Sequence, residues 1–384
     1  MKYNFDFETQ RKNTNSLKWD EVDSLYPMWV ADMDFKTAPE ITEGYLKRIS
    51  EGIYGYNVLN DKFYDAYINW WDKYHNFKMD KDWIIFSTGV VPSISSAVRS
   101  LTNIGDNVVI LTPVYNIFFN SIINNKRVVL ESPLKYENYK YEIDFNDLES
   151  KLKLEKTTLL IFCNPHNPIG KIWTKEELAK VGELANKYNV TVISDEIHCD
   201  IVKPGSSYIP FQSVSDTCMN VSVALIAPTK CFNLAGMQTS AAVIPNKKIK
   251  ALFERGLNTD ECAEGNTLAV ITPELAFNYG REWLNEMNEY VFNNKRIVKE
   301  FFDNNLKDLK VIDSEATYLV WVDCGFESKK LRDFIYEKTN VYLSDGIAYG
   351  KTGMNFLRIN VATTKKRVEE ALKLIKKAYD EYKK

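Results

Sequence analysis

The feature that most constrains the fold is an alternation of short apolar runs with helical patterns between residues 83 and 245. Several runs are apolar at nearly every position, which is typical of strands covered on both faces of a largely parallel sheet. Strands separated by helices predict βαβ units, and therefore an α/β domain built on a mostly parallel seven-stranded sheet. The predicted strands are Trp83–Ser87, Val108–Thr112, Val128–Glu131, Leu159–Asn164, Val190–Asp195, Val221–Ala227 and Ser240–Pro245.

One helix between these strands has a complete sequence signature. Thr174 and Glu177 have the spacing of a capping box, in which each side chain accepts a hydrogen bond from the other residue's backbone N–H. One apolar stripe follows, formed by Leu178, Val181, Leu184, Ala185 and Tyr188. The pattern predicts an amphipathic helix over residues 174–188 that packs on the sheet.

The pattern changes after Thr272-Pro273. A long helical stretch from about Pro273 to Leu306, with a break near Gly280, leads into further strand-like runs and a final amphipathic helix. These runs are Tyr318–Val322, Val341–Leu343 and Phe356–Val361. We expect a large domain over residues 46–272 and a smaller α+β domain formed by residues 1–45 and 273–384.

Composition argues against several classes of function. With 49 Lys and Arg against 52 Asp and Glu the net charge is −3, which favours neither nucleic acid nor an anionic membrane as a partner. Only three histidines are present, and the six scattered cysteines form no C-x-x-C pair, so we expect neither a metal site nor a disulfide framework. The polar start, Met1–Asp6, lacks the pattern of a secretory signal, and no apolar run is long enough for a membrane span. The scattered cysteines are typical of free thiols in a reducing cytoplasm, so we expect a cytoplasmic protein.

Polar residues directly follow five of the predicted strands. Ligands of doubly wound sheets bind beyond the carboxyl ends of the strands, so these residues should open onto one edge. Each has an ordinary structural explanation when taken singly, as a turn, a helix cap or a solvated surface residue. Their coincidence at one edge predicts a binding site there. The segments are Thr88–Val91, Pro113–Tyr115, Asn164–Pro168, Asp195–His198 and Pro228–Lys230.

Four motifs resemble those of the fold-type I enzymes that depend on pyridoxal 5′-phosphate (PLP). They are Asn164-Pro-His-Asn-Pro-Ile-Gly170, Ser194-Asp-Glu-Ile-His198, Ala227-Pro-Thr-Lys-Cys-Phe-Asn233 and Phe356-Leu-Arg-Ile-Asn360. With Pro27–Phe35 and Gly55-Tyr56, the chain is most similar to the cystathionine β-lyase-like C–S lyases of the class I/II aminotransferase family. The resemblance implies an aspartate-aminotransferase-like large domain, PLP as the cofactor, and a homodimer with shared active sites.

The resemblance also implies roles around the cofactor ring. Lys230 would hold the cofactor aldehyde as a Schiff base and later remove the Cα proton of the substrate. Asp195 would keep the ring nitrogen protonated, Asn164 would bond the ring 3-oxygen, and Tyr115 would stack on the ring. His198 stands where many aminotransferases have a tyrosine that donates to this oxygen, so a cofactor contact and a structural role both stay open.

The cofactor phosphate requires N–H and O–H donors. The backbone of Gly89, Val90 and Val91 opens a helix, and its amides would bind the phosphate together with the Thr229 hydroxyl. In the family's dimer, Tyr56 would reach this phosphate from the neighbouring subunit.

The amino-acid substrate requires a cation for its α-carboxylate. The planar guanidinium of Arg358 could bind this group with two parallel N–H donors. Ala31 and Asn164 are further expected substrate contacts. Many aminotransferases have an arginine eight residues after the lysine, where this chain has Gln238, and this difference resembles the lyase branch.

The resemblance implies a carbon–sulfur β-lyase that cleaves L-cystathionine or related cysteine S-conjugates to a thiol, pyruvate and ammonia. A thiol of pKa ~8.5 is a tolerable leaving group near neutral pH. Tyr115 and Tyr56 are further catalytic candidates, and the sequence does not decide whether a tyrosine or Lys230 protonates the sulfur. An aminotransferase on the same scaffold is the alternative, and a PLP-binding regulatory protein is a remote one.

Overall fold

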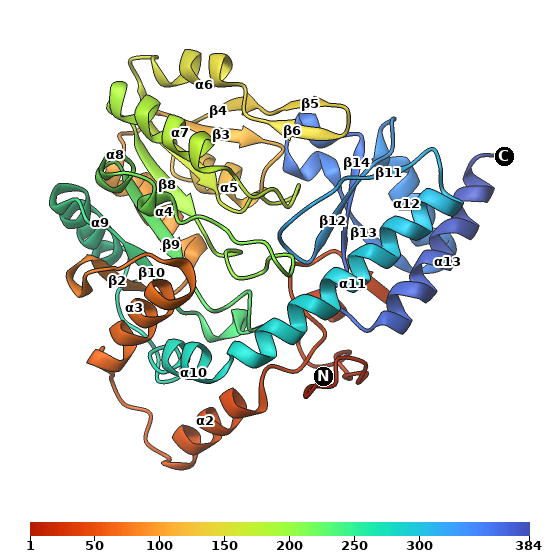
Figure 1. The fold of residues 1–384 in the computed structure, drawn as a ribbon, viewed down its shortest axis with the longest axis horizontal. Helices are drawn as coiled ribbons and strands as arrows, with labels where there is room; N and C mark the ends of the chain where they lie inside the picture. The colour runs from red at the N-terminus through yellow and green to blue at the C-terminus, as the bar shows by residue number, and fades with distance from the viewer.

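The computed structural model describes all 384 residues, and its largest element is a seven-stranded sheet (Figure 1). The strand order is β2-β10-β9-β8-β7-β3-β4, and every neighbouring pair is parallel except the two pairs that β10 makes. Each of the seven predicted runs overlaps one strand of this sheet, so the predicted fold class is confirmed. The strands are β2 Ile84–Ser87, β3 Asn107–Thr112, β4 Val128–Pro133, β7 Thr157–Cys163, β8 Thr191–Asp195, β9 Ser222–Ile226 and β10 Ser240–Val243.

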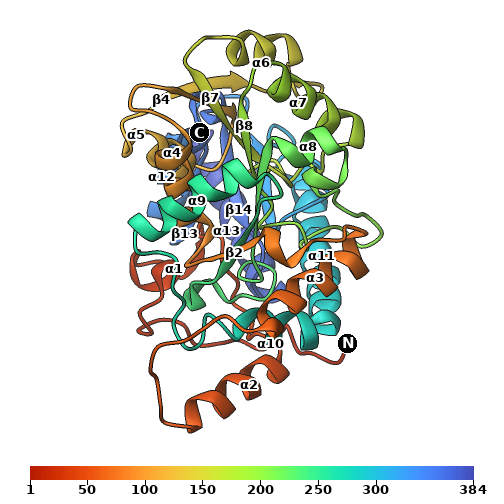
Figure 2. The ribbon, with the colours of Figure 1, turned by 90° about the vertical axis from the view of Figure 1, so that its left-hand side faces the viewer.

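Helices cover both faces of this sheet, because successive residues of a strand point to opposite sides. Ile110, Ile161 and Ile193 lie in a buried cluster with α4 (Val90–Leu101), α5 (Ile117–Ile123) and α9 (Lys247–Thr259). Their neighbours Val109, Leu160 and Val192 lie in another, with α6 (Phe145–Leu152), α7 (Lys175–Lys187) and α8 (Asp216–Asn220). Figure 2 views the sheet from its edge, with α4, α5 and α9 on one side and α7 and α8 on the other.

The predicted capping box is present at the start of α7. The Thr174 hydroxyl accepts from the Glu177 N–H at 3.1 Å, and the Glu177 carboxylate accepts from the Thr174 N–H at 2.8 Å. The apolar stripe of the helix is buried except for Tyr188, which is partly exposed at its end.

A second sheet of five strands forms in the C-terminal part of the chain, in the order β1-β13-β14-β12-β11. Its members are β1 Tyr26–Met28, β11 Lys310–Val311, β12 Leu319–Asp323, β13 Val341–Asp345 and β14 Phe356–Asn360. The three strands expected here are β12, β13 and β14, whereas the short β1 and β11 were not anticipated. Since β1 pairs with β13 in parallel, the N-terminal segment joins this sheet.

The helices of the C-terminal part follow the predicted order. The helical stretch divides at Gly280 into α10 (Thr272–Tyr279) and α11 (Arg281–Asn305). Two more helices, α12 (Ser328–Thr339) and α13 (Lys365–Tyr382), pack against each other. The domain boundaries at 45/46 and 272/273 stay predictions, and the first falls inside α2 (Pro39–Ser50).

The remaining elements are short or lie toward the N-terminus: α1 Leu17–Asp20, α3 Asp61–His75, and the hairpin β5 Lys135–Glu137 and β6 Lys140–Glu142. Figures 1 and 2 both show α2 and the loop after it at one end of the molecule, away from the large sheet. None of the helices combines the length and apolar character that a membrane-spanning segment needs.

Candidate active site

A cavity of about 260 Å³ lies beyond the carboxyl ends of the parallel strands. Nine of the predicted site residues line it: Ala31, Gly89, Val90, Val91, Tyr115, Asp195, His198, Thr229 and Lys230. The sequence predicted this edge because ligands bind where such strands end. Three predicted residues, Tyr56, Asn164 and Arg358, are not part of the lining.

Lys230 follows β9 and carries the amine of the cavity. Its Nζ donates a 2.6 Å hydrogen bond to the carbonyl oxygen of Ala31. Burial lowers the pKa of Lys230 to about 8, and the nearby positive charge of Arg358 acts in the same direction. At pH 7 a lysine with such a pKa is roughly one-tenth free amine, which is the nucleophilic and basic form, and this fraction is far larger than for an ordinary lysine of pKa ~10.4.

Asp195 is the last residue of β8 and presents a buried carboxyl group to the cavity. Its Oδ1 accepts from the Ile197 N–H at 3.2 Å, and no lysine or arginine lies within ion-pair distance of the group. Burial raises the pKa of Asp195 to about 7, with the neighbouring Glu196 acting in the same direction. A cationic N–H facing this group would favour the ionised form.

The start of α4 forms an anion-binding end of the cavity. Gly89 precedes the helix with a φ of +155°, in the region that favours glycine, and a Cβ there would lie 3.3 Å from Pro92 Cδ. Val90 and Val91 begin the helix, so their N–H groups have no partner within it. With Thr229 lining the same cavity, this end suits a phosphate group.

The groups around the cavity fit PLP. The amine of Lys230 suits the aldehyde of the cofactor, and the buried carboxyl group of Asp195 suits its ring nitrogen. The aromatic ring of Tyr115 suits the face of the cofactor ring, and the N-terminus of α4 suits its phosphate. Two buried polar atoms of the lining, Thr239 Oγ1 and His198 Nδ1, have no protein partner and are free to meet a bound group. Burial lowers the pKa of His198 to about 3, so its imidazole is neutral and can donate one N–H.

The structure places Asn164 outside the cavity lining. Its Nδ2 donates to the Ile209 carbonyl oxygen at 2.9 Å. Asn167, three residues later in the same turn, lines the cavity instead. The two asparagines follow the same strand, and only the path of the turn decides which side chain faces the cavity. We therefore hypothesise that Asn167, and not Asn164, makes the expected contacts with cofactor and substrate.

Arg358 is connected to the cavity by a hydrogen bond to Asn167, a residue of the cavity lining. Its Nη1 donates to Asn167 Oδ1 at 3.3 Å, and its Nη2 donates to the Trp29 carbonyl oxygen at 2.6 Å. The side chain is buried, and no carboxylate lies within ion-pair distance of it. A buried guanidinium without an anionic partner is suited to a carboxylate from the substrate.

Sequence reasoning missed the groups that hold the N-terminal segment over the cavity. Asn360 Nδ2 donates to the carbonyl oxygens of Val30 and Asp32, at 2.5 and 2.6 Å. Asn233 Nδ2 donates to those of Met33 and Phe35, at 3.0 and 2.9 Å. Asn233 and Asn360 are the last residues of the motifs that contain Lys230 and Arg358, but the motifs do not predict which backbone groups these asparagines bind.

Tyr318 was also missed. Its hydroxyl donates to the Ala31 carbonyl oxygen at 2.8 Å, the same atom that accepts from Lys230. Burial raises the pKa of Tyr318 well above its ordinary value, so the hydroxyl keeps its proton. The residue therefore helps to hold Ala31 in the cavity wall.

Tyr56 lies outside the site of its own subunit. It belongs to the loop after α2, and its side chain is fully exposed. The proposed contact with the phosphate of a neighbouring subunit stays a prediction.

Comparisons with known proteins show what the whole chain is similar to. The family model described as aminotransferase class I and II matches residues 36–375. Cystathionine beta-lyase PatB of Bacillus subtilis is 39% identical over 384 residues, which cover 98% of this chain and 99% of that protein. The structure of cystalysin from Treponema denticola, which contains PLP, has a TM-score of 0.96 and 34% identity over 100% of both chains. The PLP-bound C–S lyase of Staphylococcus hominis has a TM-score of 0.93 and 31% identity over 98% of both chains.

Proposed function

The chain belongs to the aminotransferase class I and II family, and on this premise we propose that it is a PLP-dependent carbon–sulfur β-lyase. It would cleave L-cystathionine or related cysteine S-conjugates, with water, to a thiol, pyruvate and ammonia. The observation that carries the proposal is that Lys230, Asp195 and the start of α4 open onto one cavity, in a chain that matches PatB over 98% of its length.

When bound, PLP supplies an electron sink that stabilises the negative charge left at Cα after its proton is removed. Lys230 would anchor the cofactor and then take the Cα proton, since its amine has a pKa of about 8 because of burial. Asp195 would hold a proton at the ring nitrogen, since a buried carboxylate favours a cationic partner. Tyr115 lines the cavity and would fix the ring plane by stacking.

Arg358 would bind the α-carboxylate of the substrate through its planar fork. Asn167 accepts a hydrogen bond from this guanidinium, so it would orient Arg358 toward the substrate. The N-terminus of α4 and Thr229 would hold the phosphate, which fixes the other end of the cofactor.

The sulfur needs a proton as it leaves, although a thiol of pKa ~8.5 is already a tolerable leaving group. Burial raises the pKa of Tyr115 to about 12, which makes it a weaker acid than the ammonium of Lys230. We favour Lys230 as the donor, because it carries the proton that it removed from Cα.

The proposal includes a homodimer in the cytoplasm. Four apolar or aromatic side chains on the loop after α2 are exposed and would be covered by a second subunit: Ile53, Tyr54, Tyr56 and Val58. Tyr56 would thereby reach the partner's phosphate. All six cysteines are free thiols, which is typical of a reducing compartment.

The test is to incubate the purified holoenzyme with L-cystathionine and to follow products in parallel. We expect pyruvate, ammonia and a new thiol in equal amounts. Transfer of the amino group to an added 2-oxo acid, without pyruvate, would identify an aminotransferase instead. A protein that binds PLP but turns over no amino acid would support the regulatory alternative.

A further inference from the structure

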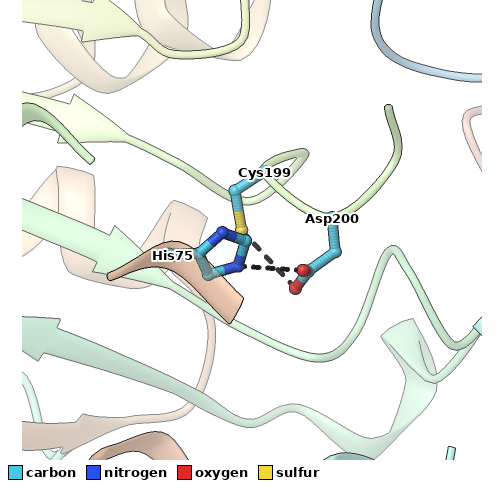
Figure 3. Close-up of side chains that lie close together, drawn as sticks. All are labelled: His75, Cys199 and Asp200. Atoms are coloured by element: carbon cyan, nitrogen blue, oxygen red, sulfur yellow. Dashed lines mark hydrogen bonds and ion pairs between the residues drawn. The ribbon is translucent and has the colours of Figure 1, made fainter. Parts of the chain in front are cut away.

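A cluster of three potential metal ligands lies outside the catalytic cavity (Figure 3). His75 is the last residue of α3, whereas Cys199 and Asp200 lie in the turns after β8. One donor atom from each of the three lies within 4.8 Å of the others. Figure 3 shows the imidazole of His75 and the thiol of Cys199 converging on the Asp200 carboxylate.

A fourth donor comes from the segment that carries the catalytic lysine. Cys231 Sγ lies 4.0 Å from Asp200 Oδ2, and Cys199 Sγ lies 3.7 Å from the same oxygen. His75 Nε2 lies 3.0 Å from Asp200 Oδ1. His75, Cys199 and Asp200 therefore bring one imidazole nitrogen, one thiol and one carboxylate around a common point, and Cys231 contacts this group through Asp200 Oδ2.

The Asp200 carboxylate has few partners of opposite charge. His75 is the only ion-pair partner of Asp200, and no lysine or arginine is paired with this carboxylate. Trp70 Nε1 donates to both Asp200 oxygens, at 3.2 and 3.1 Å, but brings no charge. Both cysteines are buried free thiols, and the side chain of His75 is only 7% exposed.

These donors match the preferences of a particular class of ion. Zn²⁺ in proteins takes four ligands in a tetrahedron, drawn from thiolates, imidazoles and carboxylates. A hard cation such as Mg²⁺ takes oxygen ligands and would not use two sulfurs. A thiol binds a metal as the thiolate, and Zn²⁺ displaces the thiol proton when it binds.

We propose that His75, Cys199 and Asp200 form a binding site for one borderline-soft divalent cation of the Zn²⁺ class, and that the neighbouring Cys231 supplies its fourth ligand. The site ties the end of α3 to two segments of the catalytic cavity, because Cys199 follows His198 and Cys231 follows Lys230. The four residues are too scattered in the chain for their spacing to reveal a site, which is why the sequence predicted none.

The test uses Co²⁺ as a spectroscopic probe of the purified holoenzyme. Tetrahedral Co²⁺ absorbs strongly in the red, where PLP does not, and thiolate ligands add a charge-transfer band in the near ultraviolet. We expect one Co²⁺ per chain with both signals, and we expect Zn²⁺ to displace it. Absence of binding to the wild-type protein, or a spectrum without the thiolate band, would overturn the proposal.

The Co²⁺ affinity of variants that lack one proposed ligand tests where the ion binds. We expect His75→Asn, Cys199→Ala and Cys231→Ala each to weaken Co²⁺ binding by at least about 10-fold, since even losing a supporting partner of a ligand costs this much. Cys324→Ala is the matched control, a buried cysteine in β12's C-terminal turn, and it should bind Co²⁺ as the wild type does. Circular dichroism checks that each variant is folded. Folded His75→Asn and Cys199→Ala proteins with unchanged binding would place the ion elsewhere and contradict the proposal.

Discussion

The Nζ of Lys230 lies 2.6 Å from the carbonyl oxygen of Ala31, a residue 199 positions earlier in the chain. The same oxygen accepts from the Tyr318 hydroxyl at 2.8 Å. Three distant parts of the sequence therefore meet at one backbone atom. The N-terminal segment is thus a wall of the cavity, which explains why its motif accompanies the lysine motif in a chain of this kind.

The two asparagines of the turn after β7 should have different effects when they are replaced. Asn167→Ala removes the acceptor for Arg358, and hydrogen bonds to charged groups contribute ~1.5–3 kcal/mol, so kcat/KM should fall about 10- to 100-fold. Asn164→Ala is the matched control. It should lower the thermal unfolding temperature, because it removes the bond to Ile209, with a smaller change in kcat/KM. A greater kinetic loss in Asn164→Ala than in Asn167→Ala would contradict this assignment.

Replacement of Asp195 by its neutral isostere tests the buried negative charge. Breaking a buried ion pair costs ~3–5 kcal/mol, so kcat of Asp195→Asn should fall by about 100- to 1,000-fold or more. Asp195→Glu keeps the charge at a shifted position and should retain more activity than Asp195→Asn. Steady-state rates measured with saturating PLP check this order. Wild-type rates in Asp195→Asn would remove Asp195 from the mechanism.

Stability should depend on pH through His166. Burial lowers the pKa of His166 to about 4, below its value of ~6.5 in an unfolded chain. Between these two values the unfolded state binds a proton that the folded state does not. The free energy of unfolding should therefore fall as pH falls through this window, by up to ~1.4 kcal/mol per pH unit from this group.

Denaturant titrations of the cofactor-free protein at pH 6.5, 5.5 and 4.5, all inside this window of ~4 to 6.5, measure the effect. His166→Gln keeps a side-chain donor for the Pro113 carbonyl oxygen, which His166 Nε2 meets at 2.9 Å, but it cannot titrate. The carboxylates and His198, whose pKa burial also lowers, contribute equally to both proteins, so the variant should show the weaker pH dependence. Parallel curves for the two proteins would refute the assignment.

Two inactive variants should restore each other's activity if the active sites are shared. Tyr56→Ala would damage the partner's phosphate site, and Lys230→Ala would inactivate its own. A mixed dimer then contains one intact site, so random pairing should give roughly a quarter of the wild-type activity. Mixing the separately purified variants under conditions that allow subunit exchange, and then assaying turnover, checks this. Activity no higher than the sum of the two variants would show that Tyr56 acts within its own subunit or not at all.

The strands of the large sheet were predictable because both faces are buried. Val108–Leu111 and Leu159–Phe162 are apolar at every position, which is how a doubly covered parallel strand is recognised. Since such strands end at a common edge, Asp195 and Lys230 could be placed at one site from the sequence. The short β1, Tyr26–Met28, has no such signal, because its pairing with β13 depends on residues more than 300 positions away.

The details of the site depended on backbone paths that the sequence does not encode locally. Asn164 and Asn167 share one turn, and no pattern tells which of them faces the cavity. His75, Cys199 and Cys231 each contact Asp200 only because α3 packs against the turns after β8 and β9. Long-range contacts of this kind become visible only in the folded chain.

The most direct test of the central claim identifies the amine that holds the cofactor. Borohydride reduction of the holoenzyme makes the link between PLP and its lysine permanent, and mass spectrometry of the digested protein then locates it. The account predicts a pyridoxyl group on Lys230 and none in the Lys230→Ala variant, which should also lose its visible absorbance band and its turnover. Lys247→Ala, which removes an exposed lysine at the start of α9, should retain all three properties. A modified lysine other than Lys230 in the wild-type protein, or undiminished turnover in Lys230→Ala, would contradict the account.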